Sequence, residues 1–259
     1  MPEKTRLLFL SANPRSSGRI QVDEEAREVI KKIQEGPYRD DFEWSVHPAT
    51  QPADIQRQLL QHRPHIVHFC GHGHKTQRLI LCGAPSRGRT VDKYGLARVF
   101  ALYKHHVRLV VLNACYTDAL ARSITQTIDY AIGAGKGIGD TAGIAFAGAF
   151  YRALGFGKSV KDAFASAKAE LALTRMPRAQ GIELFVRSGL AKSDHFPRLH
   201  DTGLRFNHTG HASECGVTIF ESLSITRFSK QIYMPARRRE AIERRIAPGS
   251  SAVPGDCGA

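Results

Sequence analysis

Residues 108–116 (RLVVLNACY) contain the feature that most restricts the fold of this chain. The apolar run Leu109–Leu112, with two β-branched valines at its centre, is typical of a strand that is buried on both faces of a sheet. Such strands occur mainly in parallel sheets covered by helices, and these sheets bind ligands at the carboxyl ends of their strands. Cys115 follows the run directly after Asn113 and Ala114, so we expect its thiol at that edge.

A second predicted strand ends in the same way. Residues 65–73 (HIVHFCGHG) are apolar through Phe69 apart from His68, and then two glycines flank His72. A Cys at the end of a buried strand is usually an inert, small apolar side chain. A positioned imidazole changes this, because it takes the thiol proton and leaves the nucleophilic thiolate. We therefore predict a dyad of His72 and Cys115, with the backbone amides of Gly73 and Cys115 as donors to an oxyanion.

The rest of the chain alternates between strand and helix patterns, which predicts an α/β fold with a mostly parallel, helix-covered sheet of about six strands. A hairpin arm is expected at 79–82, and Asp140 occupies the expected N-cap position of an apolar helix that ends at Leu154. The other predicted strands are 6–11, 42–46, 130–133 and 182–186, and the other helices are 23–34, one opened by Thr50 and Pro52, 92–103, 119–128 and one from Ser159 to about Leu173.

The pattern weakens from about Ser193 onward, where Gly, Ser, Pro, His and Arg are scattered. We expect one domain over residues 1–192 and a weakly structured C-terminal appendage over 193–259. No internal repeat is visible in the chain.

Charge and cysteine content restrict the partners. The formal net charge is +13, which would suit nucleic acid, but the basic residues are spread along the chain and only Arg237–Arg239 with Arg244 and Arg245 form a cluster. A basic solvated surface explains this better, so we do not expect nucleic-acid binding.

The chain has no signal-peptide pattern and no stretch of roughly 20 apolar residues, which predicts a cytoplasmic protein with five reduced cysteines and no membrane partner.

Two cofactor hypotheses use residues of the same region. His68, Cys70, His72, His74 and Cys82 are ligand types that zinc accepts, but a buried strand would hide His68 and Cys70, and no Cys-x-x-Cys pair accompanies them. The loop Gly133–Gly139 is rich in glycine, yet it matches neither the phosphate-binding nor the dinucleotide-binding pattern. We expect no metal and no cofactor, and we interpret the loop as a wall of the cleft.

Several blocks of the sequence together resemble a CHAT domain, the bacterial branch of the caspase- and separase-like cysteine peptidases. They are IVHFCGHG at 66–73, VVLNACY at 110–116, DYAIG at 129–133 and the stretch 138–164, and the likeness extends over about residues 5–190. The resemblance implies a caspase-like three-layer α/β sandwich, with Cys115 as nucleophile and His72 as general base and acid. It also implies cleavage of a protein or peptide substrate, often in bacterial conflict or cell-death systems, with a possible regulatory partner protein.

Asp140 has two interpretations. Relatives with a carboxylate in the primary pocket prefer a basic side chain before the scissile bond, which would make Asp140 a substrate-binding residue. As an N-cap it would instead stabilise the helix that follows by about 1 kcal/mol.

Two other classes of function remain open from the sequence. A caspase-fold module could keep the dyad but act silently, by recruiting signalling partners. A TIR-like nucleotide hydrolase would suit the opening strand, but no convincing catalytic Glu is present and the two Cys-containing blocks would be unused.

Overall fold

The computed structural model describes residues 3–17, 20–83, 87–135, 137–174, 176 and 181–190. Six strands form the main path of one sheet in the order β2-β1-β3-β6-β7-β8. The first five are mutually parallel, and β8 closes the edge in the antiparallel direction. Their bounds are β1 Thr5–Ala12, β2 Phe42–His47, β3 Ile66–His74, β6 Leu109–Asn113, β7 Tyr130–Ala134 and β8 Ile182–Val186.

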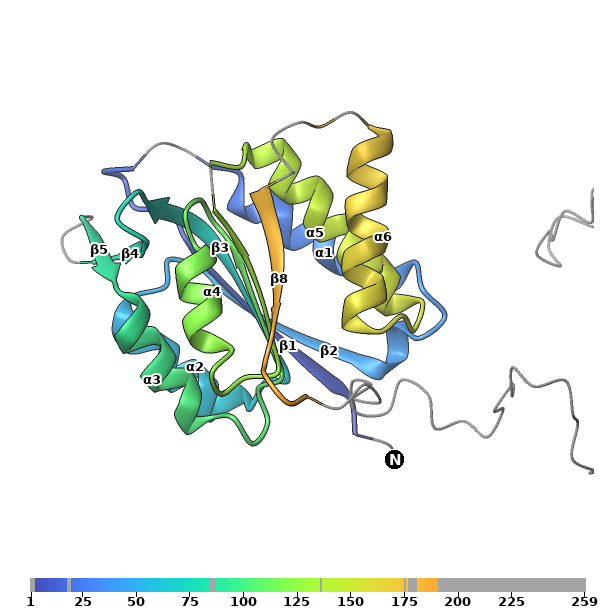
Figure 1. The fold of residues 1–259 in the computed structure, drawn as a ribbon, viewed down its shortest axis with the longest axis horizontal. Coiled ribbons are helices and arrows are strands. Elements are labelled where there is room, and N and C mark those ends of the chain that lie inside the picture. The colour runs from blue at the N-terminus through green and yellow to red at the C-terminus, as the bar shows by residue number, and fades with distance from the viewer. Residues whose placement is uncertain are drawn as a thin grey trace, which may run out of the picture. The chain divides into compact units, whose positions relative to one another are not determined.

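Helices cover both faces of this sheet (Figure 1). One face packs against α1 (Val22–Gln34), α5 (Asp140–Gly155) and α6 (Val160–Leu173). The other packs against α2 (Pro52–His62), α3 (Lys93–Leu102) and α4 (Asp118–Ile124). Because successive side chains of a strand point to opposite faces, β3 contributes Cys70 to the first core, and Val67 and Phe69 to the second. The predicted three-layer sandwich with a mostly parallel sheet is confirmed.

A small hairpin extends the sheet beside the end of β3. The strand β4 (Arg78–Cys82) pairs antiparallel with His72–His74 and with β5 (Gly88–Val91). The predicted arm at 79–82 therefore exists. The predicted appendage 193–259, including its basic cluster, lies outside the described residues.

The helices α4 and α5 are among those whose boundaries differ from the sequence expectation. The helix α4 ends at Ile124 rather than near residue 128, because the N–H groups of Gln126 and Thr127 turn to carbonyls three residues back, which tightens the last turn. The expected N-cap role of Asp140 is wrong. Gly139 is the N-cap of α5, Asp140 is its first helical residue, and no side chain caps this helix.

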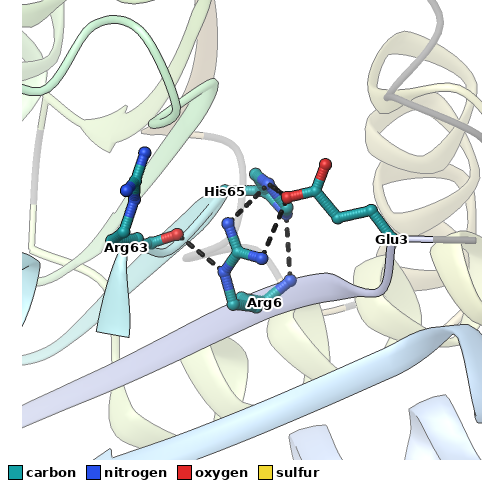
Figure 2. A network of polar contacts seen from close by, with 4 residues as sticks. All are labelled: Glu3, Arg6, Arg63 and His65. Atoms are coloured by element: carbon teal, nitrogen blue, oxygen red, sulfur yellow. Dashed lines mark hydrogen bonds and ion pairs between the residues drawn. The ribbon is translucent and has the colours of Figure 1, made fainter. Parts of the chain in front are cut away.

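A polar network fixes the amino ends of β1 and β3 (Figure 2). The backbone N–H of Arg6 donates to Nδ1 of His65 over 3.1 Å, and the Arg6 guanidinium donates to the carbonyl of Arg63 and to the carboxylate of Glu3. From this end the two strands run in register from Leu7 opposite Ile66 to Ala12 opposite Gly71. Asn13 follows Ala12, and His72 follows Gly71. The register therefore brings the side chains of Asn13 and His72 together.

Among the described helices, none is both long and apolar enough to span a bilayer.

Candidate active site

The ends of β3 and β6 meet at the carboxyl edge of the sheet. Cys70 and Asn113 are the last register partners of these strands, and His72 and Cys115 each follow two residues later. Gly73 lies so close to the turn after β6 that a Cβ atom on it would be 1.6 Å from the carbonyl oxygen of Cys115. Only glycine fits at this position, because any side chain would collide with backbone rather than with a movable side-chain tip.

His72 and Cys115 line the same pocket, which has a volume of about 70 Å³. Its walls come from α1 and the residues before it, the ends of β3 and β6, and the start of α5. None of the described residues lining it is Lys or Arg, and two are carboxylates, Glu25 and Asp140. The other lining residues are Ile20, Gln21, Cys70, Gly71, Gly73, Asn113, Ala114, Ile138, Gly139, Gly143 and Ile144.

Asn13 is a neighbour of His72 that the sequence analysis did not single out. Its Oδ1 lies 3.4 Å from Nε2 of His72, and its Nδ2 donates to the carbonyl of Ile20 over 3.1 Å. In the tautomer that satisfies this contact, Nε2 carries the proton and donates to Asn13, so Nδ1 is the unprotonated ring nitrogen. The only signal in the sequence was the position of Asn13 directly after the first strand.

Cys115 is held by a tight turn. Its Sγ lies 3.5 Å from the carbonyl of Ile138, and the next residue, Tyr116, has a φ of 57°, which is uncommon for a bulky side chain. The buried hydroxyl of Thr117 secures the turn, because it donates to the carbonyl of Ala114 over 2.9 Å and accepts from the N–H of Ala134 over 3.0 Å. The turn that carries the thiol is therefore anchored to the neighbouring strand β7.

Asp140 lies at the rim of the pocket with its side chain largely exposed. Partial burial raises the pKa of this carboxyl, while His72 lowers that pKa and Glu25 raises it. The pKa of Asp140 thus depends on both the imidazole of His72 and the carboxylate of Glu25. Ile138 and Gly139, from the predicted glycine-rich wall, line the same pocket.

A buried polar cluster lies directly behind the pocket, and we name it the Glu25 cluster. The carboxylate of Glu25 accepts from His68, Cys70 and Asn113, and His68 also contacts the hydroxyl of Tyr151. No sequence pattern points to Glu25, because an acid in the first turn of a helix normally faces solvent.

The residues considered for zinc are separated by this arrangement. His68 and Cys70 point to Glu25, whereas His74 is exposed and its Nδ1 lies 2.7 Å from the hydroxyl of Thr76. Within the described ranges, no group of three or more His, Cys, Asp or Glu side chains is placed to hold a metal ion.

Comparison with known proteins places these features in a family. The CHAT domain family model matches residues 2–198. A probable protease from Gillisia limnaea is 22% identical over 157 residues, which are 57% of this chain and 26% of that protein. A Roc-COR-CHAT protease from an unknown prokaryotic organism is 21% identical over 179 residues, which are 66% of this chain and 17% of that protein. The matched part is thus about a quarter or less of each relative's length.

Two caspases are among the solved structures that match this chain. Caspase-1 from Spodoptera frugiperda has a TM-score of 0.49 at 14% identity, with 72% of this chain and 87% of that chain covered. The Drosophila initiator caspase Dronc also has a TM-score of 0.49, at 9% identity, with 70% and 79% covered. The match to the family model extends over well more than half of the 259 residues, and the chain therefore belongs to the CHAT domain family.

Proposed function

We propose that this protein is a cysteine endopeptidase in which Cys115 is the nucleophile and His72 the general base and acid. The observation that carries the proposal is the contact between Gly73 and the Cys115 backbone, where a Cβ atom would lie 1.6 Å from the carbonyl oxygen. This contact joins the strand end that bears the imidazole to the turn that bears the thiol, and both side chains line one pocket. Family membership and the protease names of the two relatives support the same reaction class.

In the proposed mechanism, Nε2 of His72 donates a hydrogen bond to Asn13, and the unprotonated Nδ1 acts as the base. Nδ1 takes the thiol proton of Cys115, and the thiolate attacks the scissile carbonyl carbon. The amides of Gly73 and Cys115 donate to the developing oxyanion, a contribution of about 3 kcal/mol per donor in other enzymes.

Breakdown of the intermediate needs the same groups. The carbon–nitrogen bond breaks, the imidazolium gives its proton to the leaving amine, and an acyl-enzyme remains on Cys115. Water then attacks the thioester carbonyl, transfers a proton to His72, and the carboxylic acid product leaves as Cys115 regains its proton. The reaction is a hydrolysis and needs no cofactor.

We propose Asp140 as the residue that selects the substrate side chain next to the scissile bond. The Asp140 carboxylate is exposed at the rim, and no Lys or Arg is among the described residues that line the pocket, so its negative charge favours Lys or Arg in the substrate. Because Gly139 rather than Asp140 is the N-cap, no hydrogen bond of the helix end occupies the Asp140 carboxylate. We propose that the natural substrate is a protein with a basic residue at an exposed cleavage site, and that it is cut in a bacterial conflict or cell-death pathway.

The experiment that tests the proposal compares cells that express the intact chain with cells that express Cys115→Ala. New protein N-termini are identified across the proteome by mass spectrometry. We expect new termini with the intact chain alone, preceded mainly by Lys or Arg. If both forms give the same set of termini while Cys115→Ala keeps its biological effect, the protein is a recruitment module and the peptidase proposal is wrong.

A further inference from the structure

The carboxylate of Glu25 is a buried group that the proposed mechanism does not use. The residue is 4% exposed, although it belongs to the first turn of α1. Burial of a carboxylate is unfavourable unless its oxygens are satisfied. Here Oε1 accepts from Nε2 of His68 over 2.7 Å and from Nδ2 of Asn113 over 2.5 Å, and Oε2 accepts from the thiol of Cys70 over 2.9 Å.

The partners of Glu25 are themselves fixed. His68 is fully buried, its ring stacks on Phe9 with centroids 4.6 Å apart, and its Nδ1 lies 3.1 Å from the hydroxyl of Tyr151. Burial, reinforced by the charge of Glu25, raises the pKa of the Cys70 thiol, so this thiol stays protonated and can donate. The Glu25 cluster therefore links α1, β3, β6 and α5 through hydrogen bonds with little freedom to rearrange.

The position of this cluster relative to the dyad is specific. Cys70 and Asn113 are the last register partners of β3 and β6, and each lies two residues before a member of the dyad. One carboxylate thus binds both strand ends immediately before His72 and Cys115. Glu25 also lines the pocket that contains the dyad, so no further layer of side chains separates Glu25 from His72 and Cys115.

We infer that Glu25 is a positioning residue, which holds the ends of β3 and β6 at the separation that lets His72 reach the thiol of Cys115. This inference rests on the proposed function. Glu25 touches neither the scissile bond nor the dyad in this role, and it acts through Cys70 and Asn113. A misplacement of about 1 Å at a reacting group can lower a rate by about 100-fold, so such a support has a measurable effect.

The hydrogen-bond pattern allows the shape of the Glu25 side chain to be tested separately from its charge. Both fixed donors, the His68 ring and the Asn113 amide, use the same oxygen of Glu25, and only the Cys70 thiol uses the other. A thiol can accept as well as donate. In Glu25→Gln the amide oxygen can therefore accept from His68 and Asn113 while the amide nitrogen donates to Cys70. Glu25→Ala removes all three contacts.

The experiment measures the rate at which iodoacetamide alkylates Cys115 at pH 7, resolved from the other cysteines by peptide mass spectrometry, in the full chain and its variants. We expect Glu25→Ala to lower this rate by about 10-fold or more and Glu25→Gln to stay within about 3-fold of the native rate. On a peptide substrate, kcat should fall in Glu25→Ala while KM changes by less than about 2-fold. Circular dichroism and thermal unfolding check that each variant is folded.

Asp129→Asn is the matched control. Asp129 is also a buried carboxylate that joins several strands, since it binds Arg108 and Arg187, but it precedes β7 at the opposite end of the sheet. We expect this variant to lower stability and to leave the alkylation rate unchanged. If Glu25→Ala does not fold, Asn113→Ala is measured instead, because it keeps the bonds of Glu25 to His68 and Cys70 and removes only the bond to the end of β6.

Three results would overturn the inference. A folded Glu25→Ala, or Asn113→Ala in its place, that is alkylated at the native rate shows that the cluster does not position the dyad. A folded Glu25→Gln as slow as Glu25→Ala shows that the charge acts, rather than the geometry. If His72→Ala is alkylated at the native rate, the proposed function itself fails, and positioning of the dyad fails with it.

Discussion

At the scale of single residues, backbone contact decides what position 73 can hold. Gly73 adjoins the Cys115 carbonyl so closely that no side chain fits between them, and its own amide is one of the two proposed oxyanion donors. A substitution there must displace either the strand end that carries His72 or the turn that carries Cys115. The fold therefore requires glycine at position 73, and the proposed chemistry requires that the amide of this residue stays in place.

Gly73→Ala should lower both stability and reactivity. A Cβ atom 1.6 Å from a backbone oxygen forces a shift of the main chain, and we expect a loss of more than about 2 kcal/mol in the free energy of unfolding. Urea denaturation measures this loss, with Gly135→Ala as control because the nearest atom to its added Cβ is 3.7 Å away. Equal stability of the two variants would contradict the close contact between Gly73 and the carbonyl of Cys115.

Asp140→Asn should change substrate choice without destabilising the fold. The side chain makes no N-cap hydrogen bond, so the unfolding free energy should change by less than about 0.5 kcal/mol. We expect kcat/KM to fall by about 10-fold or more for peptides with Arg before the scissile bond and to stay unchanged for matched peptides with Met. An equal fall in kcat/KM for both peptides would show that Asp140 does not select the substrate side chain.

At the scale of secondary-structure elements, the turn between β6 and α4 presents the thiol, and Thr117 ties it to β7. Its hydroxyl satisfies a carbonyl before the turn and an amide of the adjacent strand, in addition to the backbone bond from the Thr117 N–H to the Ala134 carbonyl. The amino ends of β1 and β3 are tied in a comparable way by Arg6 and His65 (Figure 2).

Thr117→Val keeps the shape of the side chain and removes its hydroxyl. Buried backbone groups of Ala114 and Ala134 then lose their partner, which should lower the unfolding free energy by about 1–3 kcal/mol and slow alkylation of Cys115. Thr174→Val is the control, because that hydroxyl is exposed and bonds only within the end of α6, so its effect should stay below about 0.5 kcal/mol. Similar losses in the two variants would contradict a special role of the turn.

Acid should weaken the junction of β1 and β3. Burial lowers the pKa of His65 below 6.5, and the Arg6 guanidinium lowers it further. As the pH falls below 6.5, the unfolded chain binds a proton at this residue that the folded chain does not, so the unfolding free energy decreases, by at most about 1.4 kcal/mol per pH unit. Above pH 6.5 this contribution is constant.

Urea unfolding at pH 7.5 and 5.5 checks the sign. The native chain should lose more unfolding free energy on acidification than His65→Gln, whose side chain does not titrate. A larger loss in His65→Gln would mean that the His65 pKa is raised in the folded state.

At the scale of the whole molecule, the apolar patterns predicted the layers and the pairing direction, because strands buried on both faces leave few alternatives. The pattern also brought His72 and Cys115 to one edge. It missed Glu25 and Asn13, because their roles depend on contacts with residues far along the chain, and an acid in a first helical turn or an Asn after a strand is typical of exposed positions. Asp140 was misassigned as a cap because the extended backbone of Gly139 shifts the helix start by one residue.

The proposed peptidase activity depends on activation of Cys115 by His72, and covalent labelling measures this activation. The full chain and His72→Ala are treated with a peptidyl acyloxymethyl ketone that carries Arg next to the reactive group, and the modified cysteine is identified by mass spectrometry. We expect labelling at Cys115 in the native chain and a rate about 100-fold lower in folded His72→Ala. Equal rates in the two proteins, or labelling confined to other cysteines, would contradict it.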